Sequence, residues 1–297
     1  MRRGLVVVLV TLVLYVGILG LFVAVVPAML RAPEGGALAF GPRVAIVELE
    51  GIIIDVDDIV RDLKSHRENP LVRAVVLRVN SPGGVVGPTQ ELYRALQRVR
   101  EAGKPVVASL GAIAASGGYY AAVAADSIYA NPGTLTGSIG VVMQMANVEQ
   151  LMKKVGVDYV VVKAGQFKDL GNFARPMTPE ERRVIQSLLD DVHGQFIEAV
   201  AKGRKLDRSA VVQFADGRVF SGTQALSLKM VDALGGLEDA IDAAAKLAKL
   251  PTPPPVERAR RRFSLIDLIR NELGLTVPSL LVPPRLPMFK TPLYLMD

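Results

Sequence analysis

The chain contains no cysteine and no tryptophan, and only two of its 297 residues are histidine. A protein without cysteine has no disulfide, no cysteine nucleophile, no thiolate-bound zinc and no iron–sulfur cluster. The two histidines, His66 and His193, could supply a zinc site only poorly, and the H-E-x-x-H pattern is missing. Neither the phosphate-binding pattern G-x-x-x-x-G-K nor a G-x-G-x-x-G after a strand is present. We therefore expect no metal ion and no cofactor.

Aromatic residues make up only 5% of the chain, whereas hydrophobic residues as a whole make up 50%. This content is enough to bury a sizeable core and excludes a disordered chain. The net charge of +6 is mild, and its clearest concentration is the short run "ERARRRF" at 257–263. A nucleic-acid-binding protein normally shows a basic stripe with interleaved aromatic residues or a recognisable motif. We expect no nucleic-acid partner.

A long apolar run lies close to the N-terminus. After "MRRG", residues 5–26 are 22 uncharged residues, nearly all apolar. As a helix they would be roughly 33 Å long, which matches a bilayer core of roughly 30 Å. The apolar part of a cleaved signal peptide is usually about 7–15 residues long, so an uncleaved signal anchor is favoured. Arg2 and Arg3 precede the run and only Arg31 follows closely, which predicts a cytoplasmic N-terminus, with the rest of the chain outside the cytoplasm and tethered to the cell membrane.

The rest of the chain has the pattern of an α/β domain. Apolar strands, such as residues 44–51 and 73–80, alternate with amphipathic helices, such as residues 57–68, 88–103 and 178–202. "GVVMQ" (140–144) and "DYVVVKAG" (158–165) are further strand candidates, on either side of a predicted helix at 147–155. Several strands are apolar on both faces, which indicates a largely parallel sheet covered by helices.

Proline- and glycine-rich stretches set the predicted domain boundaries. They are "RAPEGGALAFGPR" behind the apolar run and "PTPPP" at 251–255. The predicted organisation is a cytoplasmic start and membrane anchor (1–30), a linker (31–43), the main α/β domain (44–250) and a proline-rich tail with one amphipathic segment (251–297).

A lone serine, Ser116, stands in the stretch "GAIAASGGYYAA" (111–122) of small, apolar and aromatic residues. The stretch lacks the G-x-S-x-G pattern because position 114 is alanine, and the S-x-x-K pattern does not occur in the chain. His66 lies in a polar stretch and His193 in the middle of a predicted helix, so a Ser-His-Asp triad is disfavoured. If Ser116 is a nucleophile, we expect its base to be a lysine, which can act only when it is neutral.

Lys168 is the candidate for that base. A lysine with the ordinary pKa of about 10.4 must drop by roughly three units to act at neutral pH, which requires an apolar setting. Lys168 has Phe167, Leu170 and Phe173 as sequence neighbours, whereas most other lysines have polar surroundings. The adjacent Asp169 would act in the opposite direction unless it points elsewhere. From spacing alone, the role of Lys168 stays open.

An acyl-transfer site also needs donors for a developing oxyanion. The "NSPGG" segment (80–84) lies between a predicted strand and a predicted helix, where backbone N–H groups can point at a ligand, although a simple tight turn explains it equally well. Gly117 follows Ser116 and would be a second donor at the start of a helix.

Five segments in this order resemble the signal peptide peptidase A family of Ser-Lys proteases, which have a ClpP/crotonase-like fold. They are "VNSPGG", "AASGGYYAA", "TLTGSIG", "GQFKDLG" with "RPMTPEER", and "ADGRVFSGTQALSLKMVDALGG", spread over about 200 residues. The length is similar to that of the short members with a single domain. The chain departs from the usual lysine loop at Asn172–Phe173, where a small polar residue or proline often stands.

The resemblance implies a role for five residues. They are Ser116 as nucleophile, Lys168 as general base, Ser138 as the residue that orients the lysine, and Gly84 and Gly117 as oxyanion donors. It also implies a ring-like homo-oligomer whose sites are completed by neighbouring protomers, and a C-terminal tail that in some members enters the site. The implied function is a membrane-anchored serine endopeptidase that hydrolyses remnant signal peptides and other short apolar or unfolded peptides.

Three alternatives remain. A related membrane Ser-Lys protease that cuts stomatin-like partners would share the dyad, but the Ser116-to-Lys168 interval favours signal peptide peptidase A. A crotonase-fold acyl-CoA-binding protein would share the Gly-Gly turn, but paired glutamates are not evident and an anchor would be unusual. A catalytically silent membrane scaffold is the third alternative.

Overall fold

The computed structural model of the chain describes residues 12, 14–17, 19–20, 41–258 and 293–295. The chain divides into two compact units, Met1–Gly41 and Pro42–Asp297. In the first unit the described residues between 12 and 20 are helical. Most of the predicted membrane anchor therefore lies outside the described residues, and a search of the described ones finds no helix of sufficient length and apolarity to cross a bilayer.

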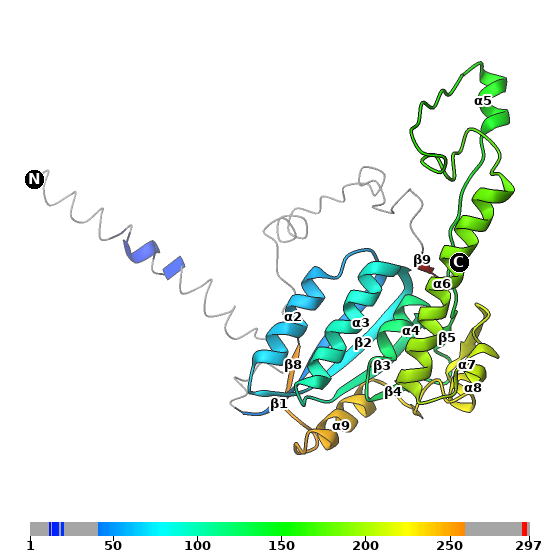
Figure 1. The fold of residues 1–297 in the computed structure, drawn as a ribbon. Helices are drawn as coiled ribbons and strands as arrows, with labels where there is room; N and C mark the ends of the chain where they lie inside the picture. Colours follow the sequence, from blue (N-terminus) through cyan, green and yellow to red (C-terminus); the bar gives the residue numbers. More distant parts are fainter. Residues whose placement is uncertain (1–11, 13, 18, 21–40, 259–292, 296–297) are drawn as a thin grey trace, which may run out of the picture. The chain divides into compact units, whose positions relative to one another are not determined.

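The second unit is a mixed α/β fold with a sheet of nine strands among its described residues (Figure 1). The strands are β1 (Arg43–Ile53), β2 (Val72–Val85), β3 (Val106–Ala115), β4 (Ser127–Ala130), β5 (Leu135–Gly137), β6 (Val219–Ser221), β7 (Ala233–Leu234), β8 (Val256–Arg258) and β9 (Leu293–Leu295). The helices are α2 (Asp57–Glu68), α3 (Val86–Glu101), α4 (Gly117–Ala122), α5 (Glu149–Val155), α6 (Pro179–Arg204), α7 (Arg208–Val212), α8 (Gly222–Ser227) and α9 (Leu237–Leu247).

The sheet has the order β6-β5-β3-β2-β1-β8, with β4 beside β3 and β7, and β9 beside β2. Only the β5–β6 and β2–β9 pairings are antiparallel; the other described pairings are parallel, as the sequence predicts. The carboxyl ends of parallel strands lie at one edge of a sheet. The ends of β2, β3 and β5 therefore come together, and four of the predicted site residues lie within or directly after these ends.

Helices cover both faces of the sheet. On β1, Ala45 and Val47 pack into one apolar cluster with residues of α2, α3, α4 and α6, whereas Val44 and Ile46 pack into a second cluster with α9. Successive side chains of a strand point to opposite faces, so burial on both faces requires a continuous apolar run. This is why β1 and β2 lack the alternation of a half-exposed strand.

Local signals in the sequence define the long helix α6. Thr178 accepts a hydrogen bond from the Glu181 N–H at 3.2 Å, and the Glu181 carboxylate accepts one from the Thr178 N–H at 2.8 Å. This capping box satisfies donors that a helix start leaves without partners, and Pro179 lacks one of those donors. The predicted helix start is confirmed.

The strand predictions for residues 140–144 and 158–165 are wrong. All of these residues except Gly140 belong to a segment that we call the arm (residues 141–177), in which α5 is the only described helix and Val142 alone forms a bridge. In Figure 1 the arm, with α5 at its tip, lies beyond the N-terminal end of α6 and away from α4. The apolar residues at 159–162 form no strand because no strand of the described sheet pairs with them.

The predicted strand at 73–80 is too short, and "SPGG" is not a turn, because β2 continues through it to Val85. Gly83 has φ +109, and the pairing with β1 changes register between Glu50 and Ile52. Gly83 and Gly84 then pair with Ile52 and Ile53. The glycines thus bend the strand without ending it, because glycine adopts positive φ without steric cost.

Candidate functional site

Ser116 lies at the junction between β3 and α4. Its backbone has φ 51 and ψ −117, a conformation that side chains with a Cβ rarely adopt. The Ser116 N–H donates to the Gly137 carbonyl at 2.7 Å, and its own carbonyl accepts from the Tyr120 N–H at 2.8 Å. The side chain is fully buried, and its Oγ has no hydrogen-bond partner among the described residues. A buried, unpartnered hydroxyl on a strained backbone is typical of a functional site.

A buried tyrosine fixes α4, the helix that begins behind Ser116. The Tyr119 hydroxyl donates to the Met230 carbonyl at 2.9 Å, and the Tyr119 side chain is fully buried. Burial raises the pKa of Tyr119 far above its usual range, so this hydroxyl remains a neutral donor. The ring of Tyr120 packs edge-on against Tyr93 and at a tilt against Phe196, with ring centroids 5.1 Å and 4.9 Å apart. The start of α4 therefore has little freedom to move.

Gly84 and Gly117 lie close together beside Ser116. A Cβ on Gly117 would lie 3.2 Å from the Gly84 nitrogen and 2.9 Å from Thr89 Oγ1, and a Cβ on Gly84 would lie 2.0 Å from the Ile53 carbonyl oxygen. Only glycine fits at these positions. The structure thus brings the two predicted oxyanion donors to one place, where β2 ends and α4 begins.

Ser138 is brought to the same place by the end of β5. It follows Gly137, whose carbonyl is the partner of the Ser116 N–H, and it is itself buried. Its backbone has φ 50, and its N–H donates to the Arg218 carbonyl at 2.9 Å. Four of the five predicted site residues, Ser116, Gly117, Gly84 and Ser138, therefore surround one point.

The C-terminal strand β9 also lies at this point. It pairs with β2 in the antiparallel direction, with Leu293 opposite Val85, Tyr294 opposite Gly84 and Leu295 opposite Gly83. β1 occupies the other edge of β2 along Gly83 and Gly84. β9 therefore adds to the edge that β3 leaves free after Ala114, next to the junction that carries Ser116.

Lys168 lies in the arm and not beside Ser116. Its side chain is exposed, and it lines an open cavity of about 430 Å³. All residues that line this cavity come from the arm: Gln144, Met145, Ala146, Tyr159, Val161, Lys168, Asp169, Gly171, Asn172 and Phe173. Within the described part of a single chain, the fifth predicted site residue is therefore separate from the other four.

Ion pairs hold the loop that carries Lys168. Asp169 accepts hydrogen bonds from Lys163 and from Arg175, and Arg175 also pairs with Glu181 at the start of α6. These hydrogen bonds hold the pKa of Asp169 well below its usual range and lower the pKa of Glu181 to about 2. Both carboxylates therefore stay ionised at neutral pH.

The sequence did not predict two contributions to this region. Thr89 is fully buried, donates to the Val85 carbonyl at 2.8 Å and lies against Gly117. Arg175 stands within the "RPMTPEER" segment, but its two carboxylate partners lie six residues away on either side. A carboxylate six residues before Arg175 and another six residues after it could have indicated these ion pairs, whereas nothing in the sequence marks Thr89.

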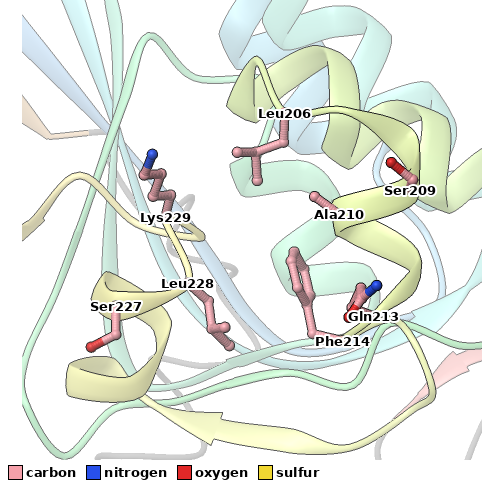
Figure 2. A pocket seen from close by; sticks show the side chains of 8 residues that line it. All are labelled: Leu206, Ser209, Ala210, Gln213, Phe214, Ser227, Leu228 and Lys229. Carbon is pink, nitrogen blue, oxygen red and sulfur yellow. The ribbon is translucent and has the colours of Figure 1, made fainter.

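A second cavity, of about 560 Å³, lies between α7 and α8, and Figure 2 shows its side chains. Its apolar lining comes from Leu206, Ala210, Phe214 and Leu228, and Lys229 is the cation among its lining residues. None of the predicted site residues lines it. Its place in the fold separates it from the junction at Ser116.

Comparisons with known proteins show which family the chain belongs to. The model of peptidase family S49 matches residues 98–251, which include Ser116, Ser138 and Lys168. A putative protease of Synechocystis sp. is 42% identical over 83% of this chain and 87% of its own length. A putative signal peptide peptidase SppA of Enterococcus faecium is 37% identical over 66% of this chain, which spans 57% of that relative.

A solved structure of a mutant membrane-bound stomatin-specific protease aligns with 74% of this chain and 98% of its own, with a TM-score of 0.48 and 14% identity. The family match covers more than half of the present chain, and the relative from Synechocystis sp. aligns over nearly its whole length. The chain belongs to peptidase family S49, as a serine protease of the signal peptide peptidase A type.

Proposed function

We propose that this chain is an endopeptidase of ClpP/crotonase-like fold in which Ser116 is the nucleophile and Lys168 the general base. The observation that supports this most strongly is the Ser116 hydroxyl, which is buried, unpartnered among the described residues and beside two glycines that tolerate no side chain. Neither histidine lies at the junction of β3 and α4 that carries Ser116, because His66 belongs to α2 and His193 to the middle of α6. A lysine base fits the chain better than a triad.

The proposed reaction has two acyl-transfer steps. The neutral Lys168 amine takes the Ser116 Oγ proton while Oγ bonds to the carbonyl carbon of the peptide. The Gly84 and Gly117 N–H groups donate to the resulting oxyanion, which is worth about 3–4 kcal/mol for each donor in related acyl-transfer sites. The C–N bond then breaks, and the Lys168 ammonium returns the proton to the leaving amine. Water repeats the sequence on the acyl-enzyme, again with Lys168 as base. Ser138 is proposed to orient the lysine.

The β9 strand suggests how a peptide substrate binds. An extended chain adds to β2 at residues 83–85 in the antiparallel direction, which places its backbone next to Ser116 and Gly84. Recognition through main-chain hydrogen bonds depends little on side chains. It therefore suits a protease that accepts remnant signal peptides and other unfolded apolar segments, which are the substrates that we propose.

We propose that a neighbouring copy of the chain completes the site. Lys168 lies in the arm, apart from Ser116. The arm also exposes large apolar side chains, which the surface of a monomeric soluble protein would not normally carry together. The Val160 and Val162 side chains are 82% and 96% exposed. In a ring-like homo-oligomer these residues would be buried, and Lys168 of one protomer would meet Ser116 of the next.

We further propose that residues 5–26 anchor the chain in the cell membrane as a single span. Their length and apolarity fit a bilayer, and the arginines before them place the N-terminus in the cytoplasm. The catalytic domain would then lie outside the cytoplasm, where the remnants of cleaved signal peptides are reached from the membrane.

Subunit mixing tests the proposal. Ser116→Ala and Lys168→Ala are each expected to abolish cleavage of an unfolded protein substrate, whereas the exposed Ser209→Ala and Lys202→Ala serve as matched controls that retain it. When the two inactive variants are unfolded, mixed and refolded together, some sites receive Ser116 from one protomer and Lys168 from another. Recovered cleavage supports a site shared between protomers. Full cleavage by either single variant would refute the dyad.

A further inference from the structure

The sequence contains a conflict at the proposed base. Asp169 follows Lys168 directly in the sequence. A carboxylate within about 4–6 Å of an amine stabilises the charged form of the amine and typically raises its pKa by about 1–3 units. A general base must lose its proton to act. The chain therefore needs an interaction that keeps the Asp169 carboxylate away from the Lys168 amine.

The structure shows where the Asp169 carboxylate goes. Its Oδ2 accepts from Arg175 through Nε at 3.1 Å and Nη2 at 2.9 Å, and its Oδ1 accepts from Lys163 Nζ. Asn172 Nδ2 approaches Oδ2 at 3.4 Å. The Asp169 side chain is only 11% exposed. Both oxygens are therefore engaged by cations other than Lys168.

Arg175 is itself fixed to the start of α6. Its Nη1 donates to Glu181 Oε2 at 2.9 Å, and its Nη2 donates to Glu181 Oε1. Glu181 in turn closes the capping box with Thr178, so its position is set by the helix. A guanidinium can hold two carboxylates in a fixed geometry because its donors form a rigid fork. Arg175 thus ties the lysine loop to a rigid element.

We propose that Arg175, assisted by Lys163, is a positioning residue that holds the Asp169 carboxylate away from the Lys168 amine, so that this amine is released from a counter-charge. The proposal rests on the proposed function, in which Lys168 is the base. Two cations and two carboxylates balance within the cluster formed by Lys163, Asp169, Arg175 and Glu181.

Other charged groups near the loop do not take over this role. Besides Lys168, the titratable residues that line its cavity are Asp169 and Tyr159. A different cavity, between the loop and the start of α6, is lined mainly by charged residues. One of them, Glu180, accepts a hydrogen bond from Gln166 at 3.0 Å. The charged lining residues of this cavity are Lys163, Arg175, Glu180, Glu181 and Arg183. Among the described residues, Asp169 is therefore the only carboxylate that lines the same cavity as Lys168.

The pH dependence of proteolysis by the full chain tests the proposal. In Arg175→Gln, Asp169 Oδ2 loses both of its hydrogen bonds from Arg175, and we expect the acidic limb of the kcat/KM profile to move up by at least one pH unit. This corresponds to about a tenfold loss at pH 7 with little loss at pH 9. Adding Asp169→Asn to Arg175→Gln removes the freed carboxylate and is expected to return the limb to its original position. In Arg175→Lys, the acidic limb should lie between its position in Arg175→Gln and its original position.

A structural role alone gives a different result. If Arg175 only stiffens the loop, Arg175→Gln lowers kcat/KM equally at every pH and Asp169→Asn does not restore it; this outcome, or an unchanged profile, overturns the proposal. Arg208→Gln, which removes the exposed pair with Glu198, is the matched control and should leave the profile unchanged. If Arg175→Gln does not fold, the kcat/KM profile of Asp169→Asn alone tests the proposal. An upward shift of the acidic limb in this variant would overturn the proposal.

Labelling separates this proposal from the proposed function. In the Ser116→Ala protein, the rate at which acetic anhydride modifies Lys168 is measured by mass spectrometry across the same pH range. The midpoint of labelling should rise in Arg175→Gln and fall back with Asp169→Asn. An active Lys168→Ala protein would refute the dyad. An inactive one, together with an unshifted midpoint in Arg175→Gln, would refute only the role of Arg175.

Discussion

Replacing Ser116 should make the protein more stable while it abolishes catalysis. The residue has two separate costs in the folded state: a fully buried hydroxyl without a partner among the described residues, and a backbone at φ 51 and ψ −117. Ser116→Ala removes the first cost and keeps the second. Ser116→Gly removes both, so the two variants separate the two contributions.

The magnitudes follow from each cost. An unsatisfied buried hydroxyl costs about 1–3 kcal/mol, so we expect Ser116→Ala to stabilise the fold by about 1 kcal/mol or more. A residue with a Cβ in this backbone region costs about 1–3 kcal/mol, of which the greater freedom of an unfolded glycine cancels about 0.5–1 kcal/mol. Ser116→Gly should therefore gain about another 1 kcal/mol. For a domain of this size, each kcal/mol raises Tm by about 2–4 °C.

Thermal unfolding followed by far-UV circular dichroism is the assay, because the chain has no tryptophan to report by fluorescence. Ser109→Ala is the matched control. Its hydroxyl is equally buried but accepts a hydrogen bond from Arg78 Nη1 at 2.8 Å, so its removal should lower Tm. The reasoning fails if Ser116→Ala melts below the original protein, or if Ser116→Gly melts below Ser116→Ala.

Two other substitutions test the packing around the sheet. Gly84→Ala would place a Cβ 2.0 Å from the Ile53 carbonyl oxygen, so β1 and β2 must separate locally; we expect a loss of about 3 kcal/mol in the urea unfolding free energy, and an unchanged midpoint would contradict the close approach. Burial lowers the pKa of His66 below 6.5, so the folded state favours the neutral ring. The contribution of this ring to the stability of the fold is therefore lost as pH falls below about 6.5. His66→Gln should accordingly show a shallower decrease of Tm between pH 7 and pH 5, and an equally steep decrease would exclude His66 as the cause.

The sequence predicts the helices of this fold well because their signals are local. The predicted range of α2, residues 57–68, is the observed one, and the capping box at Thr178 marks the start of α6. The arm was misread because apolar β-branched residues at 160–162 are typical of a buried strand, whereas in a single chain they are exposed. Propensity does not reveal whether a partner strand exists.

The predicted site shows the same division between local and distant information. Strand order explains why Ser116, Ser138 and Gly84 meet, since parallel strands bring their carboxyl ends to one edge. The sequence could pair these residues with Lys168 only through a family resemblance. It also raised the conflict between Asp169 and Lys168, but the solution depends on side-chain directions, which spacing does not determine.

The separation of the two proposed catalytic residues has a chemical consequence. A serine hydroxyl is a weak nucleophile until a base lies within hydrogen-bond reach, and water around an amine stabilises the charged form, which cannot act as a base. In the isolated chain Ser116 is buried without a partner among the described residues, and Lys168 is exposed in the arm. Each residue is therefore held in an unreactive setting. If assembly brings the arm of one copy against the junction of the next, it supplies the base and removes water from the amine in the same step. In that case we expect the protease to be active only as an oligomer.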